Sequence, residues 1–154
     1  MDYKYYDLPF GAQLLLWTSR IFYNGSCRTT PNKYEIIDLA YKKVGIHNGS
    51  ALLKGLLNIL KNIDKFKIQK ICNQCLTESE INLICCIEEH KNENINNSYY
   101  IDLWKLDAVR ELFTYSAVNL ANQFKKVNLN TDIFLKYNRK IKIENLNIIN
   151  NTLH

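Results

Sequence analysis

Glycine and proline are scarce in this chain of 154 residues, which contains five Gly and two Pro. This scarcity excludes collagen-like, proline-rich and flexible-linker architectures. Long apolar runs are also missing, whereas a bilayer span needs about 18 uninterrupted apolar residues. Four polar residues interrupt the most apolar stretch, residues 8–23, at Gln13, Thr18, Ser19 and Arg20. The first seven residues lack the cationic start of a secretory signal. We therefore expect a cytoplasmic protein with no membrane contact.

The five cysteines are an odd number, and without an export signal we expect reduced thiols. The hydrophobic share of 47% and the charged share of 23% are typical of a folded globular chain. Its length suits one domain. We predict a helical domain over residues 1–127 and a C-terminal tail over residues 128–154, either loosely packed or forming an edge strand.

Apolar residues recur every three or four positions over five segments. The segments are residues 8–23, 30–44, 48–63, 78–90 and 99–126, the last with a break near Asp107 left open. Residues 65–69 alternate with period two instead, which favours a short β-like segment. Residues 134–143 in the tail could pair with it. Together these patterns predict an all-α, compact bundle of about five helices.

Two helix starts carry side chains able to cap a helix. Asp7 is a candidate cap for the first helix, with Pro9 in its first turn. Thr77 and Glu80 form a capping box, in which each side chain accepts a hydrogen bond from the other's backbone N–H. The sequence therefore predicts that the fourth helix begins at Glu78.

The spacing of Cys72, Cys75, Cys86 and His90 is compatible with a three-Cys, one-His zinc site. Cys86 lies nine residues beyond the capping Thr77, about 13 Å along a helix, and Cys75 cannot follow it that far. On a helical wheel, Cys85 belongs to the apolar arc, whereas Cys86 and His90 fall at or beyond its border. We expect no cofactor and buried or half-buried thiols, and retain zinc as an alternative.

Residues 35–60 resemble a helix-turn-helix, from Leu39–Ala40 through Gly45 to a following apolar helix. In the family, the second helix enters the major groove of DNA. The resemblance implies contacts by Asn48, Ser50 and Lys54. The stretch over residues 54–70 is lysine-rich, and its phosphate-contact candidates are Lys54, Lys61, Lys65 and Lys67. An ordinary helical hairpin is the competing interpretation, and we prefer it.

Glycine-rich phosphate loops and the metalloprotease and serine-hydrolase motifs are absent from the sequence. We therefore expect a non-enzymatic interaction or regulatory module that acts through its surface. Its partner is a protein of unknown identity, and self-association stays open. Candidate partner anchors are the aromatic residues Tyr99, Tyr100 and Trp104. The alternatives are a nucleic-acid-binding protein and a zinc-stabilised module.

Overall fold

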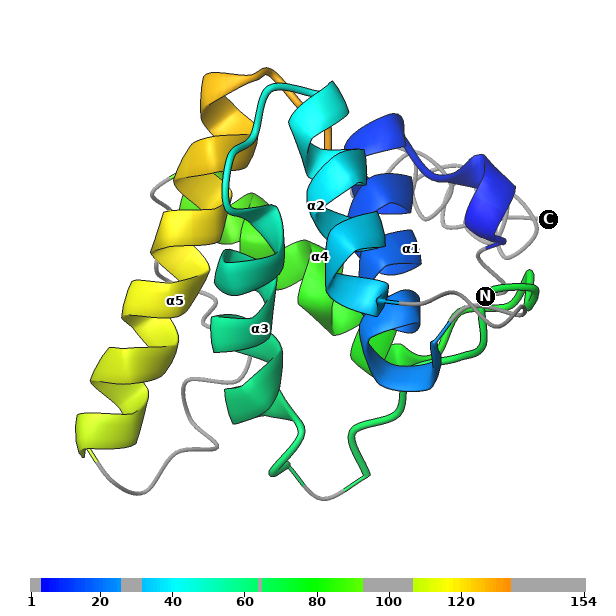
Figure 1. Cartoon of the computed structure of the whole chain (residues 1–154). Coiled ribbons are helices and arrows are strands. Elements are labelled where there is room, and N and C mark those ends of the chain that lie inside the picture. The colour runs from blue at the N-terminus through cyan, green and yellow to red at the C-terminus, as the bar shows by residue number, and fades with distance from the viewer. Residues whose placement is uncertain (1–3, 26–31, 64, 93–106, 134–154) are drawn as a thin grey trace, which may run out of the picture.

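The computed structural model describes residues 4–25, 32–63, 65–92 and 107–133, which are mostly helical (Figure 1). A short 3-10 helix, η1 (Tyr5–Asp7), precedes five α-helices. These are α1 (Phe10–Asn24), α2 (Lys33–Lys43), α3 (Gly49–Leu60), α4 (Glu78–Lys91) and α5 (Asp107–Lys126). Within those ranges the only β-type pairing is an isolated bridge between Lys4 and Cys75. The predicted all-α bundle of about five helices is confirmed. No helix in the described ranges combines the length and apolarity that crossing a bilayer requires.

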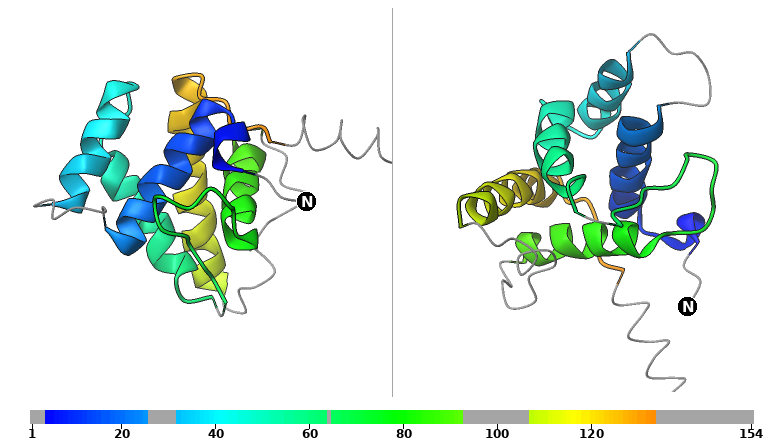
Figure 2. Two further views of the ribbon diagram at one scale, coloured as in Figure 1. Left: turned by 90° about the vertical axis from the view of Figure 1, so that its right-hand side faces the viewer. Right: turned by 90° about the horizontal axis from the view of Figure 1, so that it is seen from below.

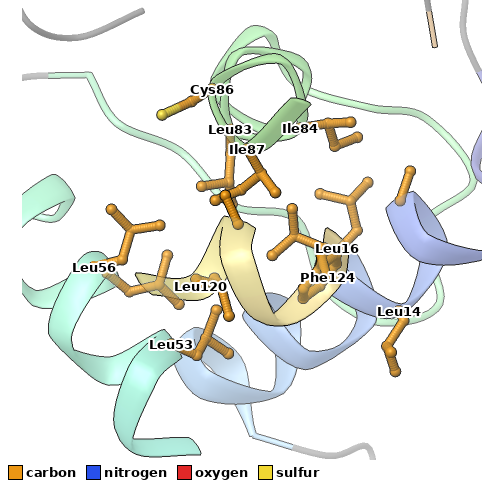
Figure 3. Packing of buried hydrophobic residues seen from close by; sticks show 14 of the residues in the cluster. Leu14, Leu16, Leu53, Leu56, Leu83, Ile84, Cys86, Ile87, Leu120 and Phe124 are labelled. Atoms are coloured by element: carbon orange, nitrogen blue, oxygen red, sulfur yellow. The ribbon is translucent and has the colours of Figure 1, made fainter. Parts of the chain in front are cut away.

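The five helices enclose one apolar core. Helix α4 packs against α5 and α1, and α3 packs against α5, α2 and α1. Figure 2 shows α4 crossing α1 instead of running alongside it. In Figure 3, Leu83 and Ile87 of α4 point toward α5, which contributes Leu120 to the same interior. The bundle is therefore held together by apolar faces that meet at its centre.

The helix boundaries correct two of the predicted starts. Asp7 does not cap α1, because it belongs to η1 and Pro9 occupies the N-cap position. Helix α2 begins at Lys33, and the Asn32 side chain accepts a hydrogen bond from the backbone of Tyr34 at 3.0 Å. The predicted opening of that helix, at residues 30–31, lies outside the described residues, as do residues 99–106 of the fifth predicted helix. The capping box of α4 is present as predicted.

Three residues differ in exposure from what the apolar patterns predicted. Phe10 is 61% exposed, although it lies in the predicted apolar segment 8–23. Cys86 is fully buried and His90 is only 7% exposed, although both were placed at or beyond the apolar border. The physical reason is that α4 is covered from more than one side, by α5 and by α1. A helix with several packed neighbours buries more than one face.

Of the two regions predicted as β-like, residues 65–69 form no strand, whereas residues 134–143 lie outside the described residues. Residues 66–70 are neither helical nor part of a strand. After α5 the chain packs back onto the bundle, with Leu129, Thr131 and Ile133 all buried. The backbone N–H of Ala12 donates to the carbonyl of Asn130 at 3.2 Å, next to Gly11 at the start of α1. Residues 134–154 of the predicted tail lie outside the described part.

Candidate functional site

A buried ion pair joins α1 to the first turn of α4. The Arg20 and Glu80 side chains are both fully buried. Arg20 Nε donates to Glu80 Oε1 at 2.8 Å, and Arg20 Nη2 donates to Glu80 Oε2 at 3.0 Å. This two-pronged geometry matches the planar guanidinium to the carboxylate. A buried charge is tolerable only when it is paired and hydrogen-bonded in this way.

Glu80 also completes the capping box, so one carboxylate has two tasks. The backbone N–H of Thr77 donates to Glu80 Oε2 at 3.0 Å, while the backbone N–H of Glu80 donates to Thr77 Oγ1 at 3.1 Å. The N–H of Gln69 donates to Glu80 Oε1 at 3.0 Å. Glu80 therefore anchors the start of α4, the preceding loop and α1 together.

Arg20 uses its remaining donors to fix the loop that precedes α4. Its Nη1 donates to the carbonyl of Asn73 at 2.6 Å, and its Nη2 donates to the carbonyl of Cys75 at 3.2 Å. The guanidinium carbon lies 5.4 Å from the centre of the Tyr5 ring. The N–H of Tyr5 donates to the carbonyl of Gln74 at 2.8 Å. The N-terminal segment and the loop over residues 69–77 are therefore held against the same buried cation.

Beside this centre the surface forms a hollow of about 490 Å³, which we call the aromatic hollow. Its lining residues are Tyr5, Tyr6, Trp17, Ile71, Cys72, Asn73 and Gln74. Tyr6 is 71% exposed, whereas Tyr5 is half-buried and its hydroxyl donates to the carbonyl of Gln13 at 3.0 Å. Burial raises the pKa of Tyr5, and the nearby Arg20 charge opposes that rise. The lining thus combines three aromatic rings with two carboxamides and carries no formally charged side chain.

The predicted nucleic-acid contacts lie elsewhere, on α3 and the loop after it. Lys54, Lys61, Lys65 and Lys67 are all exposed. Lys54 and Lys61 are seven residues apart and so share one face of the helix. The ammonium of Lys54 lies 5.3 Å from the centre of the Tyr34 ring. Lys54 and Lys61 therefore lie along one side of α3, and Lys65 and Lys67 follow in the loop after it; we call these four lysines the basic strip.

The N-terminal end of α3 is less suited to approach DNA. Asn48 is exposed and has a left-handed backbone with φ of 61°. The backbone N–H of Ser50 donates to the carboxylate of Asp38 at 2.9 Å. An acidic side chain at this end would repel the phosphate backbone. Of the contacts that the helix-turn-helix resemblance implies, Asn48 and Ser50 therefore lie at the helix end that carries this acidic side chain, whereas Lys54 belongs to the basic strip.

The four candidate zinc ligands do not come together. Cys72 and Cys75 are exposed in the loop before α4, whereas Cys86 and His90 are buried farther along that helix. Among the described residues no group of three or more Cys, His, Asp or Glu side chains could hold a metal ion. Burial raises the pKa of the Cys86 thiol well above its usual range, with the Glu89 charge adding to the rise. Burial also lowers the pKa of His90.

The predicted partner anchors, Tyr99, Tyr100 and Trp104, lie outside the described residues. No family model, curated protein or solved structure matches the chain. The aromatic hollow and the Arg20–Glu80 pair are therefore known only from the contacts and distances given above.

Apart from Cys72, a candidate zinc ligand, sequence reasoning assigned no binding role to the residues that line the aromatic hollow or support it. Arg20 was counted only as an interruption of an apolar stretch, and Glu80 only as part of a cap. The available signal was a single arginine among the apolar residues of α1. Such a residue needs a buried acidic partner. The sequence did not show which of the acidic residues would provide it.

Proposed function

We propose that this protein is a non-enzymatic interaction module of the cytoplasm, and that the aromatic hollow is its contact site. One observation carries the proposal: a hollow of about 490 Å³ lined by aromatic and carboxamide side chains without formal charge. Aromatic rings provide large contact area with few rotatable bonds, and they are common in binding surfaces. The lining includes no carboxylate, imidazole or amine, so binding suits it better than acid–base chemistry.

The occupant that fits this lining best is an uncharged, extended peptide segment of a partner protein. Aromatic grooves hold extended and polyproline-type peptides by stacking against them. The side-chain amides of Asn73 and Gln74 offer both donors and acceptors to a peptide backbone. An anionic ligand such as nucleic acid would find no cation among the lining residues. The Arg20–Glu80 pair supports the proposal by holding one wall of the hollow in place.

The test uses Trp17 as a reporter, since the chain has only one other tryptophan. In a Trp104→Phe variant, tryptophan emission comes from the wall of the hollow. We expect members of a library of uncharged, proline-containing ten-residue peptides to shift that emission in a saturable way. Tyr6→Ala should weaken binding about tenfold, equivalent to about 1.4 kcal/mol.

The matched control is Tyr115→Ala on α5, because Tyr115 is 68% exposed and is not among the lining residues. It should leave peptide binding unchanged. If no peptide changes the emission of Trp17, or if both tyrosine variants weaken binding equally, the aromatic hollow is not the contact site.

The basic strip supports a second candidate function, binding of nucleic acid. Four exposed lysines there can contact phosphates without reading sequence. On this hypothesis the chain binds random duplex DNA with an affinity that falls steeply as salt rises. Lys61→Glu combined with Lys65→Glu should abolish that binding. The double variant Lys125→Glu and Lys126→Glu, at the end of α5, has the same charge change and should retain it.

A further inference from the structure

Cys72 and Cys75 stand on one structured turn with both side chains exposed. The backbone N–H of Asn73 donates to the carbonyl of Lys70 at 3.1 Å. The N–H of Cys75 in turn donates to the side-chain oxygen of Asn73 at 3.0 Å. Arg20 holds the carbonyls of Asn73 and Cys75 from within the bundle. The turn that carries the two thiols is therefore shaped before any ligand arrives.

Two cysteines with two residues between them have the spacing of one half of a structural zinc site. Structural zinc is bound by four ligands in a tetrahedron, with zinc–sulfur distances of about 2.3 Å. The described part of the chain offers no group of three ligands. Cys86 is enclosed in the core, so its thiol cannot reach a metal held at this surface turn. A tetrahedral site at this turn therefore needs ligands from elsewhere.

We infer that Cys72 and Cys75 of two copies of this chain hold one Zn²⁺ between them as a four-cysteine site. A two-fold axis through the metal makes the two halves equivalent, as in most homodimers. Four thiols give up their protons to solvent as four zinc–sulfur bonds form. The inference goes beyond the peptide-binding proposal and does not rest on it, although Cys72 also lines the aromatic hollow.

The charges around the turn suit this assembly. Four thiolates around one Zn²⁺ leave a net charge of −2 at the metal. Lys4 is paired through its backbone with Cys75, and Lys70 precedes Cys72 by two residues; both lysines are exposed. Each copy thus carries two lysines whose backbones lie close to the cysteines, and their positive charges can offset that net charge.

The experiment uses the full chain, kept reduced with a phosphine and titrated with zinc chloride without any peptide. We expect one zinc ion per two chains by elemental analysis. The mass by light scattering should rise from the chain mass of 18.1 kDa to twice that value, and return on addition of EDTA. Cobalt in place of zinc should show the strong sulfur-to-metal absorption of a tetrahedral four-thiolate site.

Matched cysteine variants separate the possible ligand sets. Cys72→Ser and Cys75→Ser should each abolish zinc-dependent dimerisation and leave the far-ultraviolet circular dichroism unchanged, since both side chains are exposed. Cys27→Ser should retain both zinc and dimer. One zinc per monomer, a dimer that survives EDTA, zinc binding that survives Cys72→Ser, or no zinc bound would each overturn the inference. Tyr6→Ala should retain the zinc dimer, so this result and the fate of the peptide-binding proposal can be told apart.

Discussion

Replacing Glu80 by glutamine should destabilise the fold far more than a change of one atom suggests. Each of the two carboxylate oxygens of Glu80 accepts two hydrogen bonds, one from Arg20 and one from a backbone N–H. Whichever way a glutamine amide is turned, its NH₂ group faces two donors. Two hydrogen bonds are lost and the Arg20 charge stays buried without a counter-ion.

Breaking a buried ion pair by removing one charge costs about 3–5 kcal/mol. Total stability of a domain is about 5–15 kcal/mol, so Glu80→Gln should remove a large share of it. The midpoint of thermal unfolding should fall by about 6–20 °C in a chain of this size. Urea unfolding followed by circular dichroism gives the free energy directly.

The matched control is Glu78→Gln, in the same first turn of α4 but exposed. It removes only a favourable interaction with the helix dipole and should cost less than about 1 kcal/mol. Arg20→Met combined with Glu80→Gln should cost less than the sum of the single changes, because the second substitution leaves no stranded charge. If Glu80→Gln costs no more than Glu78→Gln, the pair does not have the energetic role assigned to it here.

Three further predictions concern packing, capping and pH. A Cβ on Gly49 would lie 2.3 Å from the ring of Tyr41, so Gly49→Ala should destabilise by about 1–3 kcal/mol. A Cβ on Gly55 in the same helix would meet no atom closer than 3.7 Å, so Gly55→Ala should stabilise the fold by about 0.5–1 kcal/mol. Urea unfolding that found Gly49→Ala more stable than Gly55→Ala would contradict this. Thr77→Ala loses the cap and a hydrogen bond to the loop before α4, and urea unfolding should show a cost of about 1–2 kcal/mol that Thr77→Ser largely avoids. Burial lowers the pKa of His90 below its ordinary value of 6.5, so as pH falls the imidazole is protonated in the unfolded chain before it is protonated in the folded one, and the free energy of unfolding should drop below pH 6.5. Urea unfolding at several pH values should show a smaller drop for His90→Gln. An unchanged drop in that variant would exclude the imidazole as its cause.

The helical elements were accessible to sequence reasoning because their signals are local. Apolar spacing predicted the helices, and the Thr77 and Glu80 pair placed the start of α4 at the residue where the structure has it. Local signals failed where another residue took the N-cap position, or where packing against neighbouring helices determined which residues are buried. Asn32 caps α2, Pro9 and not Asp7 occupies the N-cap position of α1, and Cys86 is buried because α4 has packed neighbours on more than one side.

The aromatic hollow was not accessible in the same way, because its residues meet only in three dimensions. Tyr5 and Trp17 come from the N-terminal part of the chain, and Asn73 comes from a loop more than fifty residues later. The contact between them depends on Arg20 reaching Glu80, sixty residues away in the sequence. A wheel or a capping rule concerns one helix at a time and cannot identify such a partner.

Helix capping and site geometry are linked in this protein through Glu80. The loop over residues 69–77 has no regular secondary structure, so few backbone hydrogen bonds of its own hold it. Its carbonyls at Asn73 and Cys75 are bound by Arg20, whose orientation is fixed by the carboxylate that caps α4. Loss of Glu80 should therefore loosen the wall of the hollow and the cysteine turn together, while a core defect such as Gly49→Ala should spare their local geometry in the folded state. Amide hydrogen exchange separates the two cases: Glu80→Gln should raise exchange in the loop more than in α3, and a uniform rise would show that the pair stabilises the bundle without shaping the site.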